Sequence, residues 1–197
     1  MSLIMPAPSS HQQQLRDESD RVLLERVVAG DREAFRTLYI AYHRRLARFL
    51  TRLTRRYELA EEIINDTMWV VWRRAGKFRG ESRVSTWIIG IAYRRALKSL
   101  KSRGQRQYET TPIENVPLVA PDELGEAETA EWILLGMQQL PTEQRLALEF
   151  AYGHGHSCEE IALIMDCPVN TVKTRLFHAR AKLRALRPGL AGTQPEL

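Results

Sequence analysis

Residues 157–183 carry the feature that most restricts how this chain can fold: two short amphipathic helices separated by a tight turn. Ser157 and Glu160 form a capping box, in which the hydroxyl accepts from a first-turn N–H and the carboxylate reaches back to the cap. A short apolar face follows, and Pro168 ends the first helix because proline lacks the N–H that a continuing helix needs. This spacing is typical of a helix-turn-helix.

The second helix of this motif has one apolar face and one polar face. Its apolar residues recur at intervals of four, three and four, and are Val172, Leu176, Ala179 and Leu183. Amide, hydroxyl, imidazole and cationic groups elsewhere on it suit base edges and phosphates in a major groove. The predicted DNA-contacting residues are Asn170, Thr171, Lys173, Thr174, Arg175, Phe177, His178 and Arg180. A basic helix that only packs on a neighbour is the alternative, and the cap and turn favour DNA binding over it.

Charge is distributed unevenly along the 197 residues, whose net charge is +5. Residues 21–106 hold 21 Lys and Arg against 8 Asp and Glu, whereas residues 107–131 hold 7 acids and no base. The remainder, 132–197, has 7 bases and 6 acids. A segregated basic excess favours a polyanionic partner, while charge that serves only solubility predicts a more even mixture. We therefore expect a basic module, an acidic connector and a nearly neutral module.

The composition also excludes several classes of protein. No run approaches the roughly 18 apolar residues of a membrane span, and the first residues lack the basic segment of a secretory signal. Cys158 and Cys167 have no partners at metal-binding spacing, and His154 and His156 lack a third ligand. We therefore expect a cytoplasmic protein with reduced thiols, no metal site, no cofactor and no catalytic residues.

Apolar periodicity predicts that the basic module is helical throughout. A short helix is expected around 22–27, a long one over 35–53, a third over 58–74 and a fourth after a loop at 76–82. One strip of the third helix has the spacing i, i+3, i+4 and i+7 and consists of Glu62, Asn65, Asp66 and Trp69. Two carboxylates, an amide and an indole indicate a protein-docking face, with a plain solvated face as the alternative.

The fourth helix carries a cationic stripe. At 100° per residue, its members lie within about 60° of Arg83, and they are Trp87, Gly90, Arg94, Lys98 and Lys101. Cations with an aromatic ring and a glycine suit single-stranded nucleic acid, and the preceding loop has residues to line a pocket for an extruded base. The predicted strand-binding residues are Phe78, Arg79, Ser82, Arg83, Trp87, Arg94, Lys98 and Lys101. A solvated basic face is the alternative.

Six motifs together resemble an extracytoplasmic-function (ECF, group IV) bacterial sigma factor of the sigma-70 family. They are EIINDTMW at 62–69, FRGES at 78–82, STWIIGIA at 85–92, LPTEQR at 140–145, SCEEIA at 157–162 and TVKTRL at 171–176. The resemblance covers about 20–186 and rests on the order and spacing of the motifs. It implies an all-α protein of two small helical domains. These are region 2 at 20–103 and region 4 at 128–187, with a flexible acidic linker at 104–127 and flexible tails at 1–19 and 188–197.

The resemblance also implies partners and site roles. Region 2 would bind the beta-prime clamp helices of core RNA polymerase through Glu62, Asn65, Asp66 and Trp69, and would open the minus-10 element with the loop and stripe described above. Region 4 would bind the beta flap and read the minus-35 element through 170–180. An anti-sigma factor is an expected partner, whereas membrane insertion, a cofactor and enzymatic activity are not expected.

Several positions depart from the usual family pattern, among them Asp166 and Asn170, which stand where Gly is frequent. Asn65 and Asp66 stand where Gln-Glu is common, which keeps the chemistry of docking. Arg94 stands where Asn is common, so the minus-10 preference of typical members does not transfer to this chain.

Two other classes of nucleic-acid-binding protein fit the sequence less well. A stand-alone helix-turn-helix regulator would typically dimerise on a palindrome without polymerase, and the docking strip argues against it. A nucleic-acid enzyme would need a supported nucleophile or metal-binding carboxylates, and the sequence contains neither pattern.

Overall fold

A computed structural model describes residues 10–102 and 136–186, and every regular element within those ranges is helical. The expected linker at 104–127, residues 1–9 and residues 188–197 lie outside the described part. The α-helices are α1 Ser10–Val28, α2 Arg32–Thr54, α3 Tyr57–Arg74, α4 Val84–Ser102, α6 Thr142–Leu148, α7 Cys158–Met165 and α8 Val169–Ala185. A 3-10 helix, η1 (Ala75–Lys77), follows α3, and a π-helix, η2 (Glu149–Gly153), follows α6. The predicted all-α fold class is confirmed.

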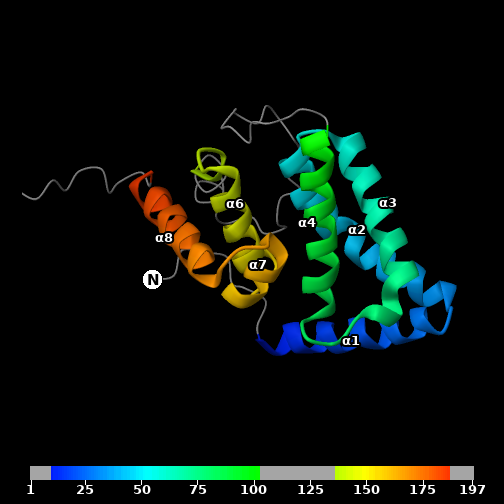
Figure 1. Ribbon diagram of the computed structural model, residues 1–197. Helices are drawn as coiled ribbons and strands as arrows, with labels where there is room; N and C mark the ends of the chain where they lie inside the picture. The colour runs from blue at the N-terminus through cyan, green and yellow to red at the C-terminus, as the bar shows by residue number, and fades with distance from the viewer. Residues whose placement is uncertain (1–9, 103–135, 187–197) are drawn as a thin grey trace, which may run out of the picture.

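Helices α1–α4 form an N-terminal bundle, and α6–α8 form a C-terminal bundle beside it (Figure 1). Helix α2 begins after Asp31, whose carboxylate accepts from the N–H groups of Glu33 and Ala34 at 2.9 and 3.1 Å. It ends at Arg55, which adopts a left-handed conformation with φ of 55°. The fully buried residues along its core face are Leu38, Tyr42, Leu46, Phe49 and Leu50.

Helix α1 includes residues 10–19, which we had expected to belong to a flexible tail. Contacts with distant residues explain the difference. The Asp17 carboxylate accepts from the N–H of Val84 at 3.2 Å, and the buried Asp20 carboxylate accepts from the hydroxyl of Tyr42 at 2.6 Å. These bonds hold α1 against α2 and the start of α4, and no local apolar period reveals them.

The helix expected around 22–27 forms the C-terminal part of α1. Leu24 and Val27 of this part are buried in the core, whereas Val22 is 49% exposed.

The C-terminal bundle contains the predicted helix-turn-helix. The Ser157 hydroxyl accepts from the N–H of Glu160 at 3.2 Å, and the Glu160 carboxylate accepts from the N–H of Ser157 at 2.9 Å. Helix α7 ends at Asp166, which is left-handed with φ of 51°, and Pro168 precedes α8. The capping box and the proline stop are thus confirmed.

The two bundles share one hydrophobic core. The ring of Phe150, from η2, is fully buried; its centroid lies 5.5 Å from that of Phe49 on α2 and 6.4 Å from that of Tyr93 on α4. Beside these rings, Arg52 of α2 donates to the Glu149 carboxylate at 2.8 Å. The sequence predicted two modules and a connector, and it did not predict that the two bundles pack against each other.

Candidate DNA-binding and polymerase-docking surfaces

Helix α8 presents most of the predicted major-groove residues on one exposed face. Asn170, Lys173, Thr174, Phe177 and His178 are exposed, and Phe177 reaches 64%. Thr174 donates to the carbonyl of Asn170 at 2.9 Å, so its hydroxyl oxygen remains available as an acceptor. On the opposite side of α8, Val172, Leu176 and Ala179 are buried as predicted and Leu183 is half-buried, which leaves the polar face free to meet a groove.

Two arginines of α8 are directed toward the C-terminal bundle instead. Arg175 forms an ion pair with Glu143 of α6 and approaches the Cys167 sulfur at 3.3 Å. Arg180 is half-buried, and its Nη1 lies 3.4 Å from the hydroxyl of Tyr152. Thr171, which was also predicted to contact DNA, is half-buried as well. The structure therefore separates five outward residues from three that contact or cover the bundle.

The predicted strand-binding residues surround the start and one side of α4. The rings of Phe78 and Trp87 pack together, with centroids 5.4 Å apart, and both are half-buried. Arg79 is exposed in the loop, with Glu81 at 3.8 Å, and the Ser82 hydroxyl lies 3.3 Å from the carbonyl of Arg83. Phe78 of the loop is thus packed against Trp87 in the first turn of α4.

The rest of the stripe is exposed along α4. Arg94, Lys98 and Lys101 all face solvent. A Cβ at Gly90 would lie 3.2 Å from Nη1 of Arg94, so the missing side chain gives the guanidinium room to lie back along the helix. Gly90 therefore accommodates Arg94 itself, in addition to the close approach of a strand that the sequence suggested.

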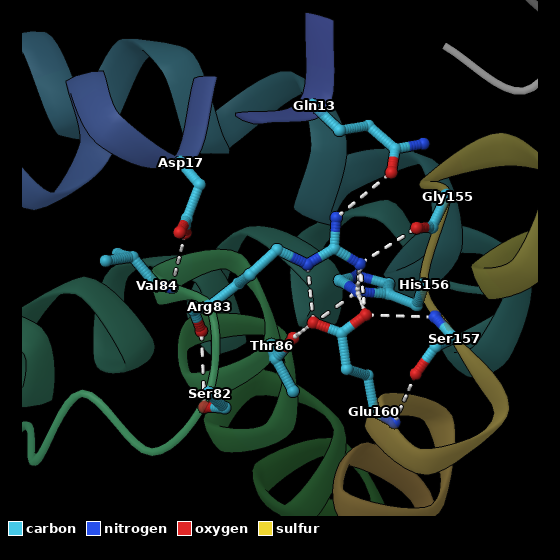
Figure 2. Close-up of polar contacts among 10 residues, drawn as sticks. All are labelled: Gln13, Asp17, Ser82, Arg83, Val84, Thr86, Gly155, His156, Ser157 and Glu160. Atoms are coloured by element: carbon cyan, nitrogen blue, oxygen red, sulfur yellow. Dashed lines mark hydrogen bonds and ion pairs between the residues drawn. The ribbon is translucent and has the colours of Figure 1, made fainter. Parts of the chain in front are cut away.

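Arg83 is the exception within this group, because it is engaged with the C-terminal bundle (Figure 2). Its Nε donates to Oε1 of Glu160 at 2.5 Å, and its Nη2 contacts the other carboxylate oxygen. The two side chains retain 21% and 16% exposure. Arg83 thus joins α4 to α7 in this conformation.

The predicted docking strip is exposed along α3, and consists of Glu62, Asn65, Asp66 and Trp69. The Asn65 amide oxygen accepts from the hydroxyl of Tyr39 at 2.8 Å. The Asp66 carboxylate accepts from Arg95 at 2.5 Å, and the Trp69 indole is 59% exposed. Neighbouring helices therefore orient two polar members of the strip, while a large aromatic surface remains uncovered.

Sequence reasoning missed the part played by His154 and His156, which we had expected to lie in a plain loop. His156 is buried, and the two rings stack with centroids 6.1 Å apart. Burial, together with the charges of His156 and of arginines on α2, lowers the pKa of His154 to about 3. Burial likewise lowers the pKa of His156. The alternation of histidine with glycine at 153–156 was the only local signal, and it does not reveal burial.

Within the two described ranges there is neither a metal-binding cluster nor a helix that could span a membrane. No group of three His, Cys, Asp or Glu residues there is arranged to hold a metal ion. Nor is any helix among them both long and apolar enough to cross a membrane.

Comparison with protein families matches both halves of the chain. The family described as sigma-70 region 2 matches residues 38–106, and sigma-70 region 4 matches residues 130–183. The RNA polymerase sigma-H factor of Pseudomonas aeruginosa is 33% identical over 187 residues, covering 88% of this chain and 97% of that protein. The ECF RNA polymerase sigma factor SigM of Mycobacterium tuberculosis is 36% identical over 170 residues, covering 86% and 85%.

Solved structures show the same fold. The sigma factor RpoE of Bartonella quintana, solved with the anti-sigma factor NepR, has a TM-score of 0.61 and 23% identity, covering 81% of this chain and 98% of that one. CnrH, solved with the cytosolic domain of CnrY, has a TM-score of 0.59 and 21% identity, covering 85% and 96%.

The two family matches on an all-helical fold define a two-region protein of transcription initiation. The chain belongs to the ECF group of the sigma-70 family of RNA polymerase sigma factors. The predicted family is thereby confirmed. As a sigma factor, the protein directs RNA polymerase to promoters.

Proposed function

We propose that the chain reads a bipartite promoter with two separate surfaces. The exposed face of α8, centred on Lys173 and Phe177, enters the major groove of the minus-35 element. The loop at 78–83 and the α4 stripe hold the unstacked strand of the minus-10 element, where Trp87 stacks and Arg94 neutralises phosphate. The domain boundaries of this proposal are 20–103 for region 2 and 128–187 for region 4.

The proposal rests chiefly on one observation, which is that region 2 exposes two faces of different chemistry. Cations line α4 and its loop, whereas α3 presents carboxylates and Trp69. Only the first face suits a polyanion, so the second is available to a protein while DNA is bound. We propose that Glu62, Asn65, Asp66 and Trp69 contact the beta-prime clamp helices of core polymerase, and that region 4 contacts the beta flap.

An anti-sigma factor is proposed as the regulator of this activity. Two proteins with the same fold were solved with protein partners, one named an anti-sigma factor and the other the cytosolic domain of CnrY. We propose that such a partner covers the surfaces named above. Catalysis of phosphodiester synthesis belongs to the polymerase in this proposal, and the chain acts in the cytoplasm without enzymatic activity of its own.

Charge reversal on the docking strip tests the polymerase assignment. The double variant E62K/D66K should weaken binding to core polymerase by at least tenfold in a fluorescence anisotropy titration, because two attractive contacts become repulsive. Glu18 and Glu25, two exposed acids on α1, provide the matched double control E18K/E25K. Thermal melting should be little changed, since exposed pairs such as Asp66–Arg95 contribute at most about 1 kcal/mol. Equal affinity of E62K/D66K and E18K/E25K for core polymerase would rule out the strip as the docking face.

A further inference from the structure

The two regions meet through a polar cluster that is centred on one guanidinium. Arg83, the residue before α4, makes a two-pronged contact with Glu160 of α7, and its Nη2 also donates to the carbonyl of Gly155 at 2.8 Å. Nη1 lies 3.4 Å from the Gln13 side-chain oxygen, and His156 Nδ1 lies 3.3 Å from Nη2 (Figure 2). Donors on all three guanidinium nitrogens are therefore directed at protein acceptors.

Glu160 is equally committed to this cluster. Besides Arg83, its carboxylate accepts from the hydroxyl of Thr86 at 2.9 Å and from the N–H of Ser157 at 2.9 Å. Burial opposes ionisation, but hydrogen bonds from His156, Arg83 and Ser157 outweigh it and hold the pKa of Glu160 well below its usual range. The partner of Arg83 is thus a fixed, ionised carboxylate that belongs to the capping box of region 4.

We propose that the Arg83–Glu160 contact is an intramolecular latch that closes region 4 onto region 2 and withholds Arg83 from the minus-10 strand. This inference rests on the proposed minus-10 role of the loop at 78–83. Glu160 supplies two oxygens where a DNA phosphate would supply its own, so one guanidinium cannot serve both at the same time. The closed chain therefore binds single-stranded DNA with the affinity of its open fraction only.

The latch has a local consequence for the rest of the strand-binding group. Thr86 lies in the first turn of α4 and its hydroxyl also donates to Glu160, so α7 sits against this turn beside Trp87. A binding partner that favours the open form frees both Arg83 and Thr86 from Glu160, because it shifts the equilibrium between the closed and open forms. Core polymerase is such a partner under the proposed function.

The variant E160Q isolates the latch. Glutamine at this position retains the capping box while it removes the charge. The adjacent Glu159 is exposed on the same helix turn, and its carboxylate interacts with Ser157 and Lys173 rather than with Arg83, so E159Q is a matched control for the loss of one negative charge. Two measurements on the full chain are compared: the radius of gyration by small-angle X-ray scattering, and anisotropy of a fluorescein-labelled single-stranded DNA of mixed sequence.

The latch predicts that E160Q has a larger radius of gyration than E159Q and binds the oligonucleotide about three- to tenfold more tightly. Equal radii for the two variants would overturn the latch, whatever the DNA measurement shows. An expanded E160Q with no gain in DNA affinity would overturn the occlusion of Arg83. The further variant R83A/E160Q tests the proposed function by itself: unchanged DNA affinity relative to E160Q would remove Arg83 from the strand-binding residues.

Discussion

Acidification is expected to destabilise the protein through His154, which lies in region 4 against the arginine-bearing face of α2. Burial first, and then the charges of His156, Arg45, Arg48 and Arg52, lower its pKa to about 3. In the unfolded chain, histidine titrates near its ordinary value of about 6.5. Below that pH the unfolded state binds more protons than the native state, so stability falls as the pH falls.

The magnitude follows from the two pKa values. Between pH 7.5 and 5.5 the unfolded His154 becomes largely protonated while the native one stays neutral. The native state then loses about 1.4 kcal/mol, a tenfold change in the unfolding equilibrium. His156 acts in the same direction, because burial also lowers its pKa. The ion pair of Arg83 with Glu160 does not titrate in this window, since the pKa of Glu160 is depressed.

Urea unfolding followed by tryptophan fluorescence at both pH values measures this effect. The variant H154Q should lose about 1.4 kcal/mol less than the parent chain between pH 7.5 and 5.5. H178Q is the matched control, because His178 is exposed on α8. If H154Q and H178Q respond equally to pH, the proposed source of the acid sensitivity is wrong.

Two further predictions concern packing and DNA binding. F150A should lower the free energy of unfolding by about 3–5 kcal/mol in the same urea assay, because the ring is fully buried against Phe49 and Tyr93. As a control, F177A truncates a ring that is 64% exposed and should change the free energy of unfolding by less than about 0.5 kcal/mol. K173A should weaken binding of the holoenzyme to promoter duplex and reduce the slope of log affinity against log salt by about one, whereas an unchanged salt slope would show that Lys173 meets no phosphate.

Local chemistry explains which parts of the fold were predictable. The capping box at Ser157 and Glu160 and the stop at Pro168 depend on neighbours within a few residues, so the sequence alone defined them. The buried face of α2 was equally visible, because its apolar residues repeat with the period of a helix. Exposure of the strip on α3 followed from the same periodicity.

Contacts between distant residues explain what could not be predicted. Arg83 and Glu160 are 77 positions apart, and nothing near either residue identifies the other. The helical start of α1 likewise depends on a bond from Val84 to Asp17, 67 positions away. Arg175 counted as a DNA contact because it is cationic and lies near the polar face, yet its ion pair with Glu143 directs it into the bundle. Charge and helical phase alone do not distinguish these two uses of an arginine.

Run-off transcription from a library of bacterial promoter fragments shows whether this chain confers promoter-specific initiation on core RNA polymerase. The reactions contain core polymerase alone, the chain alone, or both together. Discrete transcripts are expected from a subset of fragments only when both are present, and they should be lost when E62K/D66K replaces the parent chain. The same transcript pattern with and without the chain would show that it does not act as a sigma factor.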